Sequence, residues 1–266
     1  MNKMLEDFYA VPLKEKEYAI LPLGQHSFIV RTANTCIWLD PFLTPLERRC
    51  VPVLCSAQEA AGADIITGSH DHADHIDRES LPEISAASPD AVFVFPQAVA
   101  PSVNEVPQER ILPIDAGMSV TVKNVHITAV AAAHELIERD KNGCVMALGY
   151  VIEADGVKFY HSGDCCIYEG LQSELQKLGP FDFAFLPING RDAIRYKAGC
   201  IGNMTYQEAV DLAGQLDIAL TIPAHFDMFA FNSEDPQKFV DYIEAKYPSK
   251  QVHVPVPGKF FTGSAK

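Results

Sequence analysis

The sequence predicts an α/β fold, an αββα sandwich of two mixed β-sheets flanked by helices. Strand-like segments gather in two stretches of the chain, and helical segments follow each stretch. Two sheets packed face to face, with helices over their outer faces, account for this order. The 266 residues are 48% hydrophobic, and no internal repeat, low-complexity tract or long linker interrupts them. We therefore expect one domain over residues 1–266.

The first strand-rich stretch extends from Tyr18 to Leu43. Three short apolar segments separated by turns predict three strands there. The following elements alternate between helix and strand. We expect a helical stretch at 57–61, a strand at 64–68, a helix at about 77–87 and a buried strand at 91–95.

The second strand-rich stretch lies between residues 119 and 160. We expect strands at 119–122, 125–130, 145–153 and 157–160, with Lys123-Asn124 and Asp155-Gly156 as hairpin turns. The elements expected after it are a helix at 168–179, a strand at 183–187, a helix at 205–216 capped near Asn203, a strand at 219–223, a helix at 236–246 and a strand at 252–256.

A histidine cluster follows the strand expected at 64–68, where residues 70–75 read H-D-H-A-D-H. Imidazole and carboxylate groups suit zinc, manganese and iron, and residues two positions apart in an extended turn point to the same side. We therefore expect His70 and His72 to bind one divalent ion, while Asp74 and His75 face a second. A polar loop that happens to be rich in histidine is the simpler alternative.

Three later strands also end in residues that bind metals, namely His134, Asp164 and His225. Taken alone, each has an ordinary explanation. A histidine after an apolar strand is usually a hydrogen-bonded core or turn residue, and an aspartate after a Ser-Gly turn is a common helix cap. The histidine cluster, however, needs partners to complete a site. We therefore predict all three as metal ligands, with Asp164 as the bridge.

These residues occur in the order and roughly the spacing of the metallo-β-lactamase superfamily, and the resemblance covers almost the whole chain. Several segments look like its L-ascorbate-6-phosphate lactonase branch: TGSHDHADHID (67–77), YHSGD (160–164), NMT (203–205), IPAHFDMF (222–229), LGQHSF (23–28) and DPF (40–42). The resemblance implies the metallo-β-lactamase fold. It also implies a first metal site of His70, His72 and His134, a second of Asp74, His75 and His225, and Asp164 as the bridge.

The expected chemistry is hydrolysis with one or two divalent ions, Zn²⁺ or Mn²⁺. A bound ion lowers the pKa of its water from about 16 toward 7, so that a metal-bound hydroxide is available at neutral pH. We expect it to attack a lactone or ester carbonyl while Asp74 accepts or relays a proton. His161 is predicted to assist catalysis and His26 to contact substrate, each by orienting ligands or substrate.

The segment 190–197 gathers three cations in an otherwise acidic chain. Guanidinium groups suit phosphate and carboxylate, so we expect Arg191 and Arg195 to bind an anionic substrate. A solvated loop is the ordinary alternative.

Three functions follow from these patterns. The first is a cytosolic metal-dependent hydrolase that opens a lactone or ester of a small sugar acid, phosphorylated or not. The second is a metal-dependent phosphodiesterase acting on a small phosphodiester. The third is a non-catalytic metal-binding scaffold.

Composition limits the partners. A formal net charge of −14 disfavours nucleic acid and anionic membranes, so the expected partner is a small molecule. The opening residues Met1–Asp7 lack the pattern of a secretory leader, and no apolar run is long enough to span a bilayer. Seven cysteines without a framework spacing indicate a reducing compartment, so we expect a cytoplasmic protein. The pattern leaves a homo-oligomer open.

Overall fold

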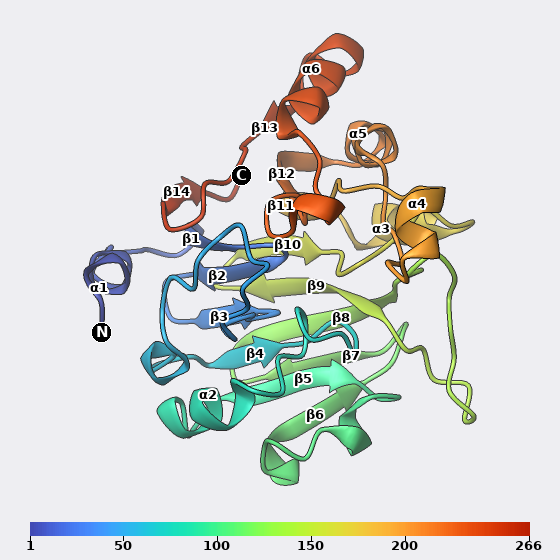
Figure 1. Cartoon of the computed structure of the whole chain (residues 1–266). Coiled ribbons are helices and arrows are strands. Elements are labelled where there is room, and N and C mark those ends of the chain that lie inside the picture. Colours follow the sequence, from blue (N-terminus) through green and yellow to red (C-terminus); the bar gives the residue numbers. More distant parts are fainter.

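The computed structural model describes all residues 1–266, which form two seven-stranded sheets with helices outside them (Figure 1). The strands of sheet A are, in spatial order, β14 (Phe261–Ser264), β1 (Glu17–Gly24), β2 (Ser27–Arg31), β3 (Cys36–Leu39), β4 (Ile65–Thr67), β5 (Val92–Pro96) and β6 (Ile111–Ile114). Those of sheet B are β13 (Gln251–Val252), β12 (Ile218–Ala224), β11 (Phe181–Pro187), β10 (Val157–His161), β9 (Leu148–Ala154), β8 (Val125–Ala131) and β7 (Ser119–Val122). The predicted αββα sandwich is confirmed.

Both sheets are mixed. In sheet A, β14, β1, β2 and β3 pair antiparallel, and β3, β4, β5 and β6 pair parallel. In sheet B, β7 to β10 pair antiparallel, and β10 to β13 pair parallel. The carboxyl ends of β4, β10 and β12, which pair in parallel, and of β8, which pairs antiparallel, lead into the residues of the candidate site described below.

The helices are α1 (Lys3–Tyr9), α2 (Leu81–Ala87), α3 (Leu171–Leu178), α4 (Ala193–Lys197), α5 (Tyr206–Gln215) and α6 (Pro236–Lys246). The chain also contains four short 3₁₀ turns: η1 (Ala57–Glu59), η2 (Ala100–Ser102), η3 (Gln108–Arg110) and η4 (Ala230–Asn232). No helix combines the length and the hydrophobicity that crossing a lipid bilayer requires.

Side chains that alternate between the two faces of each sheet form separate apolar layers. On β1, Ile20 packs between the sheets, whereas Ala19 and Leu21 face the outer layer of sheet A. Phe28 of β2 and Phe185 of β11 stack across the interface between the sheets, with ring centroids 4.1 Å apart. Because successive strand residues point to opposite faces, each strand contributes to both layers.

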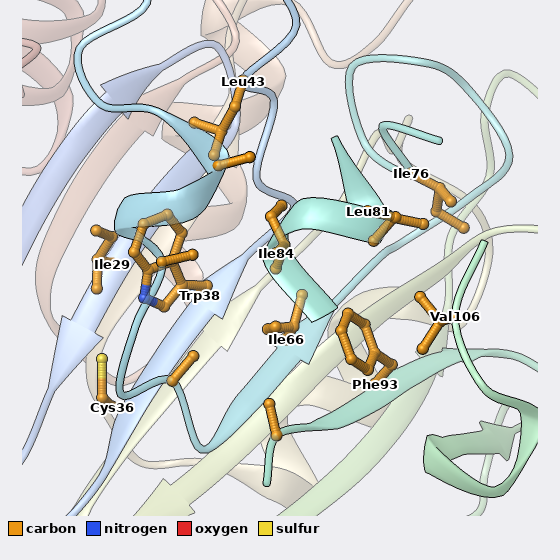
Figure 2. Close-up of a cluster of buried hydrophobic side chains, with 14 of the residues drawn as sticks. Ile29, Cys36, Trp38, Leu43, Ile66, Ile76, Leu81, Ile84, Phe93 and Val106 are labelled. Carbon is orange, nitrogen blue, oxygen red and sulfur yellow. The ribbon is translucent and has the colours of Figure 1, made fainter. Parts of the chain in front are cut away.

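Figure 2 shows the outer layer of sheet A, where strand residues such as Trp38, Ile66 and Phe93 pack against Leu81 and Ile84 of α2. All five side chains are 2% exposed or less. Burial of each large apolar side chain contributes about 1.5–3 kcal/mol. The layer therefore fixes β4, the strand that leads into the histidine cluster.

Helices α3, α5 and α6 cover the outer face of sheet B. Helix α5 begins with a capping box, in which Thr205 Oγ1 accepts from the amide of Glu208 (3.3 Å) and Glu208 accepts from the amide of Thr205 (2.8 Å). The prediction that this helix is capped near Asn203 was therefore wrong by two positions. The side-chain Nδ2 of Asn203 instead donates to Asn189 Oδ1 at 3.1 Å.

Other differences have local causes. The helix expected from residue 77 begins at Leu81, because Asp77 accepts hydrogen bonds from the amides of Leu43 and Thr44 (both 2.8 Å) and holds the preceding residues in a turn. The strand expected at 252–256 is limited to Gln251–Val252. The sequence patterns also missed α1, β6, α4 and β14.

Candidate metal centre

The candidate centre lies where strands of both sheets end, at the edge toward which the arrow of β4 points in Figure 1. His70 and His75 follow β4, His134 follows β8, Asp164 follows β10 and His225 follows β12. The carboxyl ends of parallel strands are a common location for binding sites in α/β folds. The seven residues predicted as ligands from the sequence converge here.

The histidine cluster forms a compact turn rather than the start of a helix. The amides of His75 and Ile76 donate to the carbonyl of His72 at 3.0 and 2.8 Å. Within this turn, Asp71 points outward to Arg78, with 2.8 Å between Oδ1 and Nη2. The turn therefore directs the side chains of His70 and His72 toward the candidate centre, whereas the side chain of Asp71 points away from it.

A glycine positions Asp164. Gly163 has φ +57°, and a Cβ at this position would lie 2.7 Å from the carbonyl oxygen of Leu148. Only glycine avoids both the strained conformation and this clash. The Ser-Gly turn thus brings the Asp164 carboxylate between the two groups of histidines.

Three imidazoles form the first group. His72 Nδ1 lies 2.9 Å from His70 Nε2 and 3.3 Å from His134 Nε2. Their ligand atoms all lie within 4.8 Å of one another. A tetrahedral ion about 2.0–2.1 Å from each nitrogen would place neighbouring nitrogens at similar separations.

The second group surrounds the other side of Asp164. His75 Nε2 lies 3.3 Å from Asp164 Oδ1, and His225 Nε2 lies 3.2 Å from Asp164 Oδ2. Asp74 Oδ2 is 3.6 Å from both of these imidazole nitrogens. Asp164 Oδ2 is also 3.7 Å from His134 Nε2, so its carboxylate faces both groups.

The donor set fits a divalent cation. His75 Nε2 and Asp164 Oδ1 are buried and have no hydrogen-bond partner in the protein. Buried polar atoms without a partner are costly, and a cation shared by several of them removes that cost. Imidazole with carboxylate suits Zn²⁺, Mn²⁺ and Fe²⁺ alike.

The electrostatics also favour a cation. Burial raises the pKa of Asp164, but His225 and His75 lower it well below its usual value. Burial lowers the pKa of His225, but Asp164 and Asp74 raise it to about 9. The carboxylates thus stay ionised and attract positive charge into a buried site.

Sequence reasoning gave no role to Asp40, which follows β3. Its Oδ2 lies 2.8 Å from His75 Nδ1, and it also accepts from Ser69 Oγ. Burial raises the pKa of Asp40, but nearby His161 and the hydrogen bonds of His75 and Ser69 lower it overall. An ionised Asp40 holds the proton of His75 on Nδ1, which leaves Nε2 free to face the metal centre.

Gln25 was also missed as a site residue. Its Nε2 donates to Asp74 Oδ2 at 2.7 Å and lies 3.0 Å from His225 Nε2. Gln25 and His225 both adopt positive φ, +59° and +58°, and the amide of His225 donates to the carbonyl of Gln25 at 2.8 Å. Non-glycine residues in this conformation often mark functional sites. Gln25 lies in the segment LGQHSF (23–28), but a single glutamine in a turn did not indicate a contact with Asp74 and His225.

His26 and His161 lie beneath the centre. Both are 0% exposed, and His26 Nδ1 is 3.7 Å from Asp164 Oδ1. Burial lowers the pKa of His26 to about 3, and burial also lowers the pKa of His161, whose ring lies 4.2 Å from that of His26. Neither lines the cavity, so the geometry supports an orienting role for both and not a direct contact of His26 with substrate.

Arg191 and Arg195, expected to bind an anion, are engaged within the protein. Arg191 makes two hydrogen bonds to the Glu208 carboxylate, at 2.7 and 2.8 Å. Arg195 Nε donates to Asp192 at 2.7 Å, and its Nη1 donates to the carbonyl of Asn189 at 2.6 Å. Neither lines the cavity over the metal centre, so the structure does not support an anion-binding role for them.

A cavity of about 270 Å³ opens over the centre. Its polar wall includes Asp74, Asp164 and His225, and Arg48, Phe229 and Phe231 line another part. A neighbouring pocket of about 120 Å³ adjoins it at His72 and His134.

Comparisons with known proteins agree with this geometry. The family described as "Beta-lactamase superfamily domain" matches residues 35–226. A "UPF0173 metal-dependent hydrolase" of Thermococcus onnurineus is 30% identical over 225 residues, covering 84% of this chain and 91% of that protein. A protein of the same name from Anoxybacillus flavithermus is 28% identical and covers 82% and 91%. The solved structure of Igni18, a metallo hydrolase from Ignicoccus hospitalis, aligns with a TM-score of 0.72 at 22% identity over 94% of this chain and 100% of that one.

Proposed function

The chain belongs to the metallo-β-lactamase superfamily and is a metal-dependent hydrolase, and on this premise we propose that it opens a lactone or ester of a small sugar acid, phosphorylated or not. The observation that carries the proposal is the convergence of seven histidine and aspartate side chains at a cavity of about 270 Å³. The resemblance of the sequence to the ascorbate-phosphate lactonase branch supports the choice of substrate. We further propose one or two ions of Zn²⁺ or Mn²⁺ as the cofactor.

The residues that would hold the ions are the two groups around Asp164. A divalent ion bound there supplies a nucleophilic hydroxide at neutral pH and polarises the carbonyl oxygen. Asp74 is the member of the centre best placed to move a proton, because its side chain is 20% exposed whereas that of Asp164 is 4% exposed. The Asp74 carboxylate can accept a proton and return it to the leaving alkoxide.

The remaining residues orient this machinery. Gln25 fixes the Asp74 carboxylate through its 2.7 Å hydrogen bond. We propose that His161 acts indirectly: its Nε2 lies 3.0 Å from the carbonyl oxygen of His26, and His26 in turn faces Asp164. Such support around a metal centre controls ligand orientation.

A small phosphodiester is the second candidate substrate. Two groups of donors share Asp164, and a pair of ions about 4 Å apart can stabilise both the attacking and the leaving oxygens of an in-line displacement. The same centre therefore suits either reaction.

We propose a small-molecule partner, with no nucleic acid or membrane as partner, and a cytoplasmic location. The net charge of −14 and seven cysteines without a paired spacing support this assignment. A homo-oligomer is compatible with it.

The decisive experiment combines elemental analysis of the purified protein with a panel of lactones, esters and small phosphodiesters, assayed before chelation, after chelation and after metal add-back. Lactone or ester turnover that disappears on chelation and returns with metal supports the proposal. Turnover of phosphodiesters alone makes the second candidate the function. Metal-loaded protein inert toward the whole panel supports a metal-binding scaffold instead.

A further inference from the structure

One positively charged side chain lies in the wall of the cavity over the metal centre. Arg48 is the only lysine or arginine among the thirteen residues that line it. Its side chain is exposed, and its guanidinium carbon lies 5.3 Å from the centroid of the Phe229 ring. The chain carries a formal net charge of −14, so most of its surface repels anions. Arg48 is therefore a local exception at the entrance to the site.

Arg48 also differs from every other arginine in the chain, because it has no hydrogen-bond partner within the protein. The others donate to carbonyl, carboxylate or hydroxyl oxygens: they are Arg31, Arg49, Arg78, Arg110, Arg139, Arg191 and Arg195. A guanidinium carries five N–H donors in a planar arrangement that matches carboxylate and phosphate. Arg48 keeps all of these donors available to a ligand.

The backbone that carries Arg48 is well anchored. The neighbouring Arg49 turns inward, where Nη1 donates to the carbonyls of Phe42 and Thr44, both at 3.1 Å. Its guanidinium carbon lies 4.4 Å from the centroid of the Phe42 ring. The amide of Cys50 donates to the carbonyl of Met228 at 2.7 Å, which ties this segment to the residues after β12. Binding an anion at Arg48 therefore requires little ordering of the loop.

The pocket that adjoins the cavity has the opposite character. Its apolar members are Leu136, Met146, Ala147 and Ile201, and its acidic members are Asp71 and Glu138. Leu136 is 73% exposed and Ile201 is 38% exposed. Apolar side chains beside a catalytic centre gain free energy when a ligand covers them, whereas the Glu138 carboxylate disfavours a second anion.

We propose that Arg48 binds an oxyanion of the substrate, carboxylate or phosphate, while the pocket at Leu136, Met146 and Ile201 receives its uncharged end. The scissile carbonyl then lies between the two ends, over the metal centre. This inference rests on the proposed function and narrows it: the substrate class is an ester or lactone with one anionic end. The Phe229 ring supports the guanidinium from one side and leaves its edge free for the anion.

The test uses the metal-loaded full-length protein and two 4-nitrophenyl esters, 4-nitrophenyl hydrogen adipate and its methyl ester, in which methylation removes the charge of the far end. The variants are Arg48→Gln, Arg48→Lys and, as a charge-matched control, Lys177→Gln on the exposed side of α3. We expect Arg48→Gln to raise KM for the anionic ester by about 10- to 100-fold, the range for a hydrogen bond to a charged group, and to change KM for the methyl ester by less than about threefold. Arg48→Lys keeps the positive charge and should raise KM for the anionic ester by a smaller factor. Lys177→Gln should leave KM for both esters unchanged.

A binding measurement separates this inference from the proposed function. Adipamate, the monoamide of adipic acid, has the same anionic end and no labile ester, and its binding is measured by calorimetry. Equal KM changes for both esters, or adipamate binding that does not depend on Arg48, would overturn the anion site while ester hydrolysis still stands. Adipamate binding that is lost in Arg48→Gln, in a protein that hydrolyses no ester or lactone, upholds the anion site and overturns the proposed lactone or ester hydrolysis.

Discussion

Asp40 Oδ2 lies 2.8 Å from His75 Nδ1, and both side chains are 0% exposed. The pair joins the end of β3 to the turn after β4, two neighbouring parallel strands of sheet A. A histidine whose Nδ1 proton is fixed by a carboxylate presents Nε2 as its lone-pair donor. The relationship makes Asp40 part of the metal centre, although Asp40 does not line the cavity over it.

We expect Asp40→Asn to lower the metal affinity of the second site by about 10- to 100-fold, because the amide no longer fixes the tautomer of His75 or raises its basicity. The measurement is competition with a chromophoric chelator, with Asp71→Asn as the matched control because Asp71 points away to Arg78. Unchanged affinity in Asp40→Asn would show that the pair serves only the packing of the two strands.

The two groups of ligands predict that substitutions in one group remove a different metal ion from substitutions in the other. His72 belongs to the group with His70 and His134, whereas His225 belongs to the group with Asp74 and His75. We expect His72→Ala and His225→Ala each to lose one equivalent when both sites are filled, and Asp164→Ala to lower occupancy of both because its carboxylate faces both groups. Elemental analysis after dialysis measures the stoichiometry. Complete loss of metal in both histidine variants would mean that the centre binds as one unit.

Asp74→Asn tests the proton transfer. We expect kcat to fall about 10²- to 10⁴-fold, with KM within about threefold, because the amide cannot accept a proton. Asp74 also faces His75 and His225 as a predicted ligand, so the assay is done at saturating metal with metal content measured in parallel. Full recovery of kcat at saturating metal would assign Asp74 to metal binding alone.

Much of the fold was predictable because its strands are short, apolar and separated by clear turns. The hairpin residues Lys123 and Asp155 do adopt positive φ, as their turns require. The missed strands β6 and β14 contain Pro113 and Gly263, which weaken any strand signal. They exist because neighbouring strands pair with them, β5 with β6 and β1 with β14, and a local pattern does not contain that information.

The candidate site was predictable to the extent that its residues are chemically distinctive. The histidines and Asp164 follow strands and share one chemistry, so their pattern stands out in the sequence. Asp40 and Gln25 are ordinary residue types, and their roles depend on contacts across 35 and 49 positions. The sequence also does not show whether an arginine has a hydrogen-bond partner within the protein. Arg191 has one and Arg48 has none, because the fold places Glu208 beside Arg191.

Asp155 offers a prediction about stability. It lies in the β9–β10 turn and accepts from Thr32 Oγ1 (2.6 Å) and from the amide of Asn34 (2.7 Å) in the β2–β3 turn, and from Asn124 Nδ2 (3.1 Å) in the β7–β8 turn. One carboxylate thus joins turns of both sheets. Partial burial raises the pKa of Asp155, but the hydrogen bonds from Asn34 and Thr32 lower it overall.

Because the folded pKa of Asp155 is below its unfolded value of about 3.9, its contribution to stability is present above that pH and is lost as the pH falls through the folded pKa. Asp155→Asn keeps a residue that tolerates positive φ but removes the charge, so we expect it to lower the free energy of unfolding by about 1–2 kcal/mol at pH 7. The difference in the free energy of unfolding between Asp155→Asn and the wild type should become smaller below pH 4. Urea unfolding of the chelated protein between pH 3 and 7 measures it, with Glu244→Gln, an exposed carboxylate on α6, as the control. A loss of the same size at every pH would assign the effect to turn geometry and not to the ionised carboxylate.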